Sequence, residues 1–127
     1  MKIEKTSYSA VLGVVLNNQR KMGGIEQGEM AERMGLSQAS YSRLESGKSS
    51  FSVDQMYQAA VALGIKASDL TEALNDTVER LRESGVEVVP QVRGNTTQAK
   101  SSAAGDVGKV LAGATLGAVL ITLLSKR

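Results

Sequence analysis

The sequence of 127 residues predicts an all-α protein with five short helices, a flexible linker and a separate apolar helix at its C-terminal end. Apolar side chains recur at helical spacing through the first 84 residues, and glycines or serines interrupt them at short intervals. Residues 94–105 are small and polar, as in a linker. We therefore expect a domain over residues 1–84 with its core at about 9–75, a linker over 85–106 and the apolar helix over 107–127.

The five expected helices follow one another through short connections. Glycines end them because glycine readily adopts helix-terminating conformations, and serines begin two of them because a serine hydroxyl accepts a hydrogen bond from a free amide. In chain order they are residues 9–22 before Gly23-Gly24, 27–34 before Gly35, 38–45 after Ser37, 53–63 between Ser52 and Gly64, and a fifth from residue 66 or 68 to Gly85.

Composition excludes several classes of function. The chain has no cysteine and no histidine, which removes thiolate metal sites and most nucleophile–base pairs. We expect no enzyme activity, no metal and no cofactor, and the lack of cysteine is typical of a cytoplasmic protein. Residues 1–84 carry ten basic and eleven acidic side chains, whereas the remainder carries five and two. The domain is therefore almost neutral and the tail is basic.

The stretch SQASYSRLESGK predicts a helix with little to bury. Its only sizeable apolar side chains are Tyr41 and Leu44, three residues apart. The connection Gly35-Leu36-Ser37 is so short that this helix must cross the preceding one steeply, with close approach at Ala31. The rest of its surface is exposed and begins with small or amide side chains, which suits a helix that enters the major groove of DNA.

Residues 12–74 resemble the helix-turn-helix domain of phage repressors, the XRE family. The matching residues are Arg20, Gly24-Ile25, Gln27, Met30-Ala31, Met34-Gly35, Ser37-Gln38, Tyr41, Leu44-Glu45, Gly47-Lys48, Ser52 and Ala62-Leu63-Gly64-Ile65. The resemblance implies a transcriptional regulator that binds specific double-stranded DNA through its third helix. Tyr41 stands where the family usually has an aliphatic residue, and Glu26 where it has a serine or threonine cap.

The resemblance also implies roles for individual side chains. Gln27 would touch a phosphate and brace Gln38, whose amide would pair with adenine. Arg20 and Glu45 would form an ion pair between the first and third helices. The other positions expected to face DNA are Ser37, Ala39, Ser40 and Arg43 on the third helix, and Lys48 and Ser49 in the following loop. The alternative for these residues is an ordinary solvated surface, with Arg43 paired to Glu29 or Glu32.

A nearly neutral monomer would bind DNA poorly, so we expect a homodimer. Leu70, Leu74 and Leu81 are spaced by four and then seven residues, which indicates a possible seam between two copies of the fifth helix. The alternative is that Leu70 and Leu74 pack on their own domain.

The tail combines a long uncharged run with basic ends. Residues 110–124 carry no charge, and Gly113 and Gly117 form a GxxxG motif that permits close helix packing in lipid. Residues 107–125 would span about 28 Å as a helix, marginal for a bilayer core of about 30 Å. Two interpretations remain: a tail anchor at the cytoplasmic face of a membrane, and a helix buried in an oligomer or against a partner protein.

Two functional classes follow from these observations. The first is a sequence-specific, dimeric DNA-binding regulator that its tail anchors or assembles. The second is an antitoxin-like or membrane-scaffold interaction protein, whose tail binds a partner and whose DNA binding is secondary or lost. The match at Gln27, Gln38 and Lys48 favours the first class, and the apolar tail favours the second.

Overall fold

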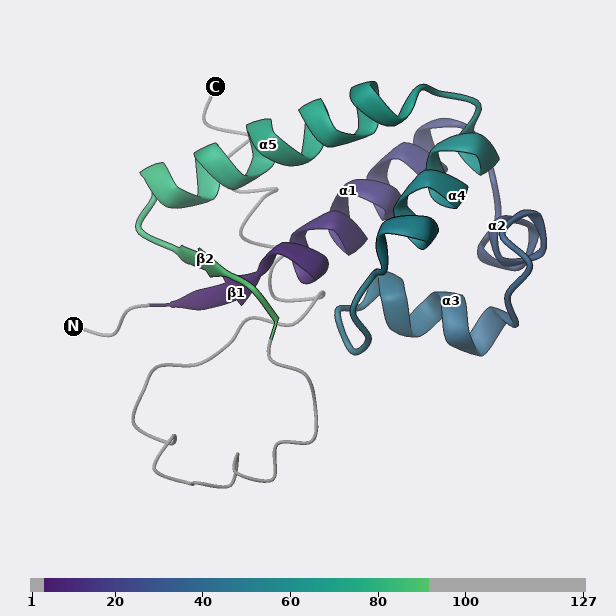
Figure 1. The fold of residues 1–127 in the computed structure, drawn as a ribbon, viewed down its shortest axis with the longest axis horizontal. Coiled ribbons are helices and arrows are strands. Elements are labelled where there is room, and N and C mark those ends of the chain that lie inside the picture. The colour runs from purple at the N-terminus through teal and green to yellow at the C-terminus, as the bar shows by residue number, and fades with distance from the viewer. Residues whose placement is uncertain (1–3, 92–127) are drawn as a thin grey trace.

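The computed structural model describes residues 4–91, which form five helices and a two-stranded sheet (Figure 1). The elements are β1 Lys5–Ser7, α1 Tyr8–Met22, α2 Gln27–Arg33, α3 Gln38–Glu45, α4 Val53–Leu63, α5 Ala67–Glu83 and β2 Glu87–Val89. The expected series of five helices is confirmed. The apolar segment 107–127, with Gly113 and Gly117, lies outside the described residues, as does the linker beyond residue 91.

Serine side chains define the start of three helices. Ser7 Oγ accepts a hydrogen bond from Ala10 N and begins α1. Ser37 caps α3 in the same way, and at α4 the cap is reciprocal between Ser52 and Gln55. Each cap satisfies an amide that has no partner within its helix. These local bonds explain why the helix starts follow so closely from the sequence.

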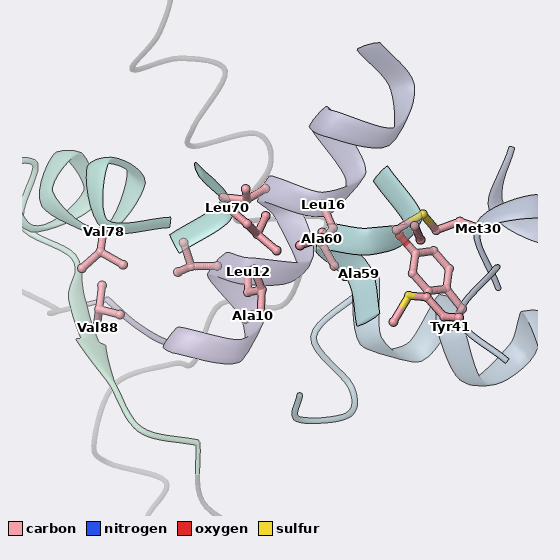
Figure 2. Close-up of a cluster of buried hydrophobic side chains, with 14 of the residues drawn as sticks. Ala10, Leu12, Leu16, Met30, Tyr41, Ala59, Ala60, Leu70, Val78 and Val88 are labelled. Atoms are coloured by element: carbon pink, nitrogen blue, oxygen red, sulfur yellow. The ribbon is translucent and has the colours of Figure 1, made fainter. Parts of the chain in front are cut away.

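The core lies around α1, which packs against α3, α4 and α5. Leu16 on α1 and Leu70 on α5 are completely buried, and Ala60 of α4 lies beside Leu16 (Figure 2). Small alanines on α4 allow this helix to approach α1 closely. Burial of each large aliphatic side chain contributes about 1.5–3 kcal/mol, so these contacts hold the helices together.

A short parallel strand pair joins the two ends of the described chain. Strand β1 pairs with β2 in the register Lys5 to Glu87 and Ser7 to Val89, and Glu87 N donates a 2.8 Å hydrogen bond to Glu4 O. Val88 is buried and faces Val78 of α5 (Figure 2). The folded domain thus continues past Ser84, and residues 85–91, which the sequence places in the linker, belong to it.

The expected dimer seam on α5 is wrong. Leu70 and Leu81 are 0% exposed, and Leu74 packs against the same core. Helix α1 and strand β2 both pack against α5 and cover the face that carries these leucines. A side chain buried inside one copy cannot contact another copy, so α5 does not provide a leucine seam.

No helix among residues 4–91 is long and apolar enough to cross a membrane.

Candidate nucleic-acid interface

Helices α2 and α3 form a compact pair joined by a tight turn. Gly35 has a φ of 72°, a left-handed conformation that favours glycine. Leu36 N then donates to Ala31 O at 2.9 Å, and Ser37 caps α3. Ala31 is buried where the two helices meet. The turn therefore presents α3 at the surface at a steep angle to α2, as the sequence predicts (Figure 1).

Helix α3 buries one narrow face and exposes the other. Tyr41 and Leu44 lie in the interior, whereas Gln38, Ala39 and Arg43 are exposed at the surface. Ser37 is exposed and Ser40 half-buried, and their hydroxyls are 3.0 Å apart in a hydrogen bond that belongs to the helix cap. The residues expected to face DNA on this helix therefore share its outer surface, although the two serines are already engaged with each other.

The amide of Gln38 and the two nearby cations make no hydrogen bond or ion pair through their side chains within residues 4–91. Arg43 bonds to neither Glu29 nor Glu32, and Glu29 pairs instead with Arg33 at 2.6 Å. Lys48 is exposed, and its backbone amide donates to Arg43 O at 2.9 Å. The loop after α3 thus folds back on the helix end and holds Lys48 and Ser49 beside Arg43.

Gln27 departs from the role implied by the resemblance. Its Nε2 donates to Glu45 Oε1 at 3.0 Å, and it forms no hydrogen bond with Gln38. A carboxylate is a stronger acceptor than a neutral amide, so the contact with Glu45 is the favoured one. Gln27 ties α2 to the base of α3, and the expected brace on Gln38 is absent from the described structure.

The carboxylate of Glu45 is the centre of a buried hydrogen-bond network under the motif. Arg20 donates from Nε at 2.7 Å and from Nη2 at 3.1 Å, which confirms the expected ion pair. Asn17 Nδ2 donates at 2.9 Å and the hydroxyl of Tyr41 at 2.5 Å, in addition to Gln27. Five donors from α1, α2 and α3 therefore converge on one side chain, and they fix the three helices relative to one another.

The network shifts the pKa values of its members. Burial acts to raise the pKa of Glu45, but hydrogen bonds from Arg20, Tyr41, Asn17 and Gln27 outweigh it and hold that pKa below its ordinary value. The pKa of Tyr41 is raised, first by burial and then by its hydrogen bond to Glu45. Glu45 is therefore ionised and Tyr41 protonated around neutral pH, as the network requires.

The charge around this surface is mixed. Residues 4–91 contain nine lysines and arginines against twelve aspartates and glutamates. On α2, Glu26 and Glu32 are exposed, and Glu26 makes no side-chain cap. Arg43 and Lys48 supply positive charge at α3, but the described part as a whole has a small acidic excess. The geometry suits a groove-binding helix, whereas the charge supplies few phosphate contacts.

Comparison with known proteins gives the same motif. Residues 16–70 match the model of the helix-turn-helix family HTH_3. Two solved structures of the clp gene regulator ClgR from Corynebacterium glutamicum are similar. One has 26% identity and a TM-score of 0.53, and the match covers 55% of this chain and 91% of that one. The other has 24% identity and a TM-score of 0.55, with coverages of 61% and 84%. No curated protein matches the sequence significantly.

Proposed function

We propose that this chain, whose residues 16–70 form a helix-turn-helix domain, is a non-enzymatic transcriptional regulator that reads double-stranded DNA with α3. The observation that carries the proposal is the outer face of α3, where the amide of Gln38 and the guanidinium of Arg43 are exposed and without a partner in residues 4–91. The network at Glu45 holds this face rigidly. The similarity to ClgR, a regulator of clp genes, supports the same class.

Each exposed group has a defined contact. Gln38 can pair with adenine in the bidentate manner of glutamine, with Nε2 donating to N7 and Oε1 accepting from the N6 amino group, and Arg43 can reach guanine or a phosphate. Ala39 offers a methyl contact to thymine. Lys48 and Ser49 follow the DNA backbone, while Gln27 holds α2 on Glu45. Because DNA is the ligand, we place this domain in the cytoplasm.

The test begins with selection of a preferred duplex from a random pool by the wild-type chain. Gln38→Ala should then weaken binding to that duplex by about 1–3 kcal/mol and relax preference at one base pair. Lys48→Ala should weaken all duplexes similarly and reduce the slope of log affinity against log salt by about one. Gln58→Ala, at an exposed position on α4, is the matched control. Unchanged affinity and preference in both variants would exclude α3 as the reading helix.

We also propose that the regulator acts as a homodimer on a near-palindromic site, with its two α3 helices about 34 Å apart. The acidic excess of the described domain supports this, because one copy neutralises few phosphates. With the α5 leucines buried, the surface best suited to a second copy is an apolar stripe on α4. It consists of Val53, Tyr57 and Val61, which are 67%, 55% and 79% exposed, and the only charged residue of α4 is Asp54.

Sedimentation equilibrium tests the dimer. Val61→Glu should shift the protein toward monomer and weaken binding to a palindromic site more than to a half-site, since it places two like charges at the contact. Gln58→Glu adds the same charge beside the stripe and should leave the dimer intact. A wild-type chain that is monomeric both free and on DNA would contradict the dimer.

Residues 107–127 are proposed to tether this regulator to a membrane or to a partner. The support is the uncharged run at residues 110–124, which needs an apolar environment. The same run favours the second candidate, an antitoxin-like or scaffold protein whose tail binds a partner. Membrane fractionation of the full chain and of a chain ending at Gln91 distinguishes the two roles. If only the full chain sediments with membranes, the anchor is supported. If the full chain is soluble, the anchor is contradicted.

A further inference from the structure

Gly28 of α2 leaves space that the side chain of Gln38 occupies. A Cβ added at Gly28 would lie 3.3 Å from Gln38 Oε1 and 3.8 Å from Gln38 Cδ, and apart from its own helix no other atom of residues 4–91 would lie within 4 Å. The first distance is tighter than ordinary van der Waals contact, so a side chain at this position would press on the amide. Within the described part of the chain, the side chain that occupies the space at Gly28 is therefore the one proposed to read the base.

Backbone conformation does not require a glycine at this position. Gly28 lies within helix α2, and it is not among the glycines with positive φ. An alanine in the same helix would be more favourable, because glycine has a low helix propensity. The absence of a side chain is thus explained by its neighbour on α3 and not by the local fold.

The neighbourhood determines which group must move when Gly28 gains a side chain. Helix α2 is held on one side by the bond from Gln27 to Glu45 and on the other by buried Met30 and Ala31. Gln38 is exposed and its amide makes no hydrogen bond within residues 4–91. The flexible amide moves more easily than the fixed helix, so a Cβ at Gly28 displaces Gln38 outward by a few tenths of an ångström.

We propose that Gly28 is a positioning residue for base recognition, which acts by allowing the amide of Gln38 to rest against α2. This inference rests on the proposed function of α3. A bidentate contact to adenine requires both the oxygen and the nitrogen of the amide to be aligned with the base edge, so a small displacement loses part of the contact. Gly28 thereby contributes to specificity through Gln38, without a side chain of its own.

The test is Gly28→Ala in the full chain, with affinity measured on the selected duplex and on duplexes changed at the base pair that Gln38→Ala identifies. We expect affinity for the selected duplex to fall about fivefold or more. Binding to non-specific duplex should stay unchanged, and the melting temperature should be equal or higher. In a chain that already carries Gln38→Ala, the same change should have no further effect on binding.

Three results overturn the inference. If Gly28→Ala binds the selected duplex with the affinity and base preference of the wild type, the space at Gly28 is not needed for recognition. If Gly28→Ala lowers DNA affinity equally in the wild-type chain and in the chain that carries Gln38→Ala, the change acts elsewhere on α2. A lower melting temperature shows that the helix pair, and not the side chain, takes up the strain. A fourth result, a wild-type chain that selects no duplex at all, overturns the proposed function and the inference with it, whereas the first three leave the proposed function standing.

Discussion

At the scale of single residues, the carboxylate of Glu45 connects the fold to the candidate site. Resemblance to the family predicts its pairing with Arg20, but the donors Asn17, Gln27 and Tyr41 come from places that sequence spacing does not bring together. Asn17 lies 28 positions from its acceptor. Tyr41 stands where the resemblance leads one to expect an aliphatic residue. Its ring is buried like an aliphatic side chain, and its hydroxyl donates a hydrogen bond to Glu45.

Tyr41→Phe should lower the free energy of unfolding by about 1.5–3 kcal/mol, because it removes a buried hydrogen bond to a charged group. Urea unfolding followed by circular dichroism at neutral pH measures the change. Tyr57→Phe removes a hydroxyl from a tyrosine that is 55% exposed, and it should be neutral. Equal stability of both variants would contradict the role of the network.

The same network predicts how stability changes with pH. The pKa of Glu45 is depressed in the folded chain from an ordinary value of 4.5, so the folded state binds its proton less readily than the unfolded state. The resulting stabilisation is present above about pH 4.5 and is lost as the pH falls through the folded pKa. Urea midpoints measured between pH 7 and 3 should show this loss in the wild type and a weaker dependence in Glu45→Gln.

The exposed positions of the site follow from the sequence better than the contacts beneath them. Gln38 and Arg43 are outward because Tyr41 and Leu44 must be inward, and a helical period is enough to predict that. The direction of Gln27 and the space at Gly28 depend on how α2 and α3 meet in three dimensions. Neither residue type nor spacing contains that information.

At the scale of elements, the contact between α1 and α3 depends on Gly13. A Cβ at this position would lie 2.6 Å from both Leu44 O and Glu45 O, which are backbone atoms at the end of α3. Backbone cannot move aside as an exposed side chain does. The apolar pattern of α1 identifies its buried face, but it does not reveal that the neighbouring helix lies against the backbone of α1 at this point.

Gly13→Ala should therefore destabilise the domain by about 1–3 kcal/mol, in spite of the better helix propensity of alanine. Gly28→Ala is the matched comparison, because its new methyl group meets only the amide of Gln38. Thermal unfolding should show a lower midpoint for the first variant and an equal or higher one for the second. If both midpoints rise, α1 and α3 do not meet as closely as the structure places them.

Prediction of the elements succeeds where local chemistry decides and fails where tertiary contacts decide. The helix starts follow from Ser37 and Ser52, whose caps need only a few neighbouring residues. The leucine spacing of α5 is the same for a buried face and for a seam between copies, so it predicted the wrong partner for Leu70 and Leu81. Strand β1 is three residues long, and its sequence, KTS, carries no apolar alternation that would announce it.

At the scale of the whole molecule, the parallel pair of β1 and β2 closes the domain by joining its two ends. Val86 and Val88 are buried under α5, and their backbone lies beside Lys5–Ser7. This closure extends the folded domain past Ser84, through strand β2 and the contact of Gln91 with Ser7. Long-range strand pairing of this kind cannot be inferred from a sequence pattern around residue 85 alone.

A chain ending at Ser84 should consequently be less stable than a chain ending at Gln91, by about 3–6 kcal/mol, because two buried valines are lost. The longer chain should unfold at the same urea midpoint as the full chain. Far-ultraviolet circular dichroism during urea titration provides the comparison. Identical midpoints for the two truncated chains would show that the strand pair contributes nothing to stability.

The position of the strand pair has a mechanical consequence. The hydroxyl of Ser7 donates a 3.1 Å hydrogen bond to Gln91 Oε1 at the N-terminal end of α1, whereas α2 follows the opposite end of that helix (Figure 1). A force that pulls on the polypeptide downstream of Gln91 would act first on the hydrogen bonds between β1 and β2, and then on α1, which follows β1 directly. The strand pair therefore takes up the load before it reaches the contact between α1 and α3 at Gly13.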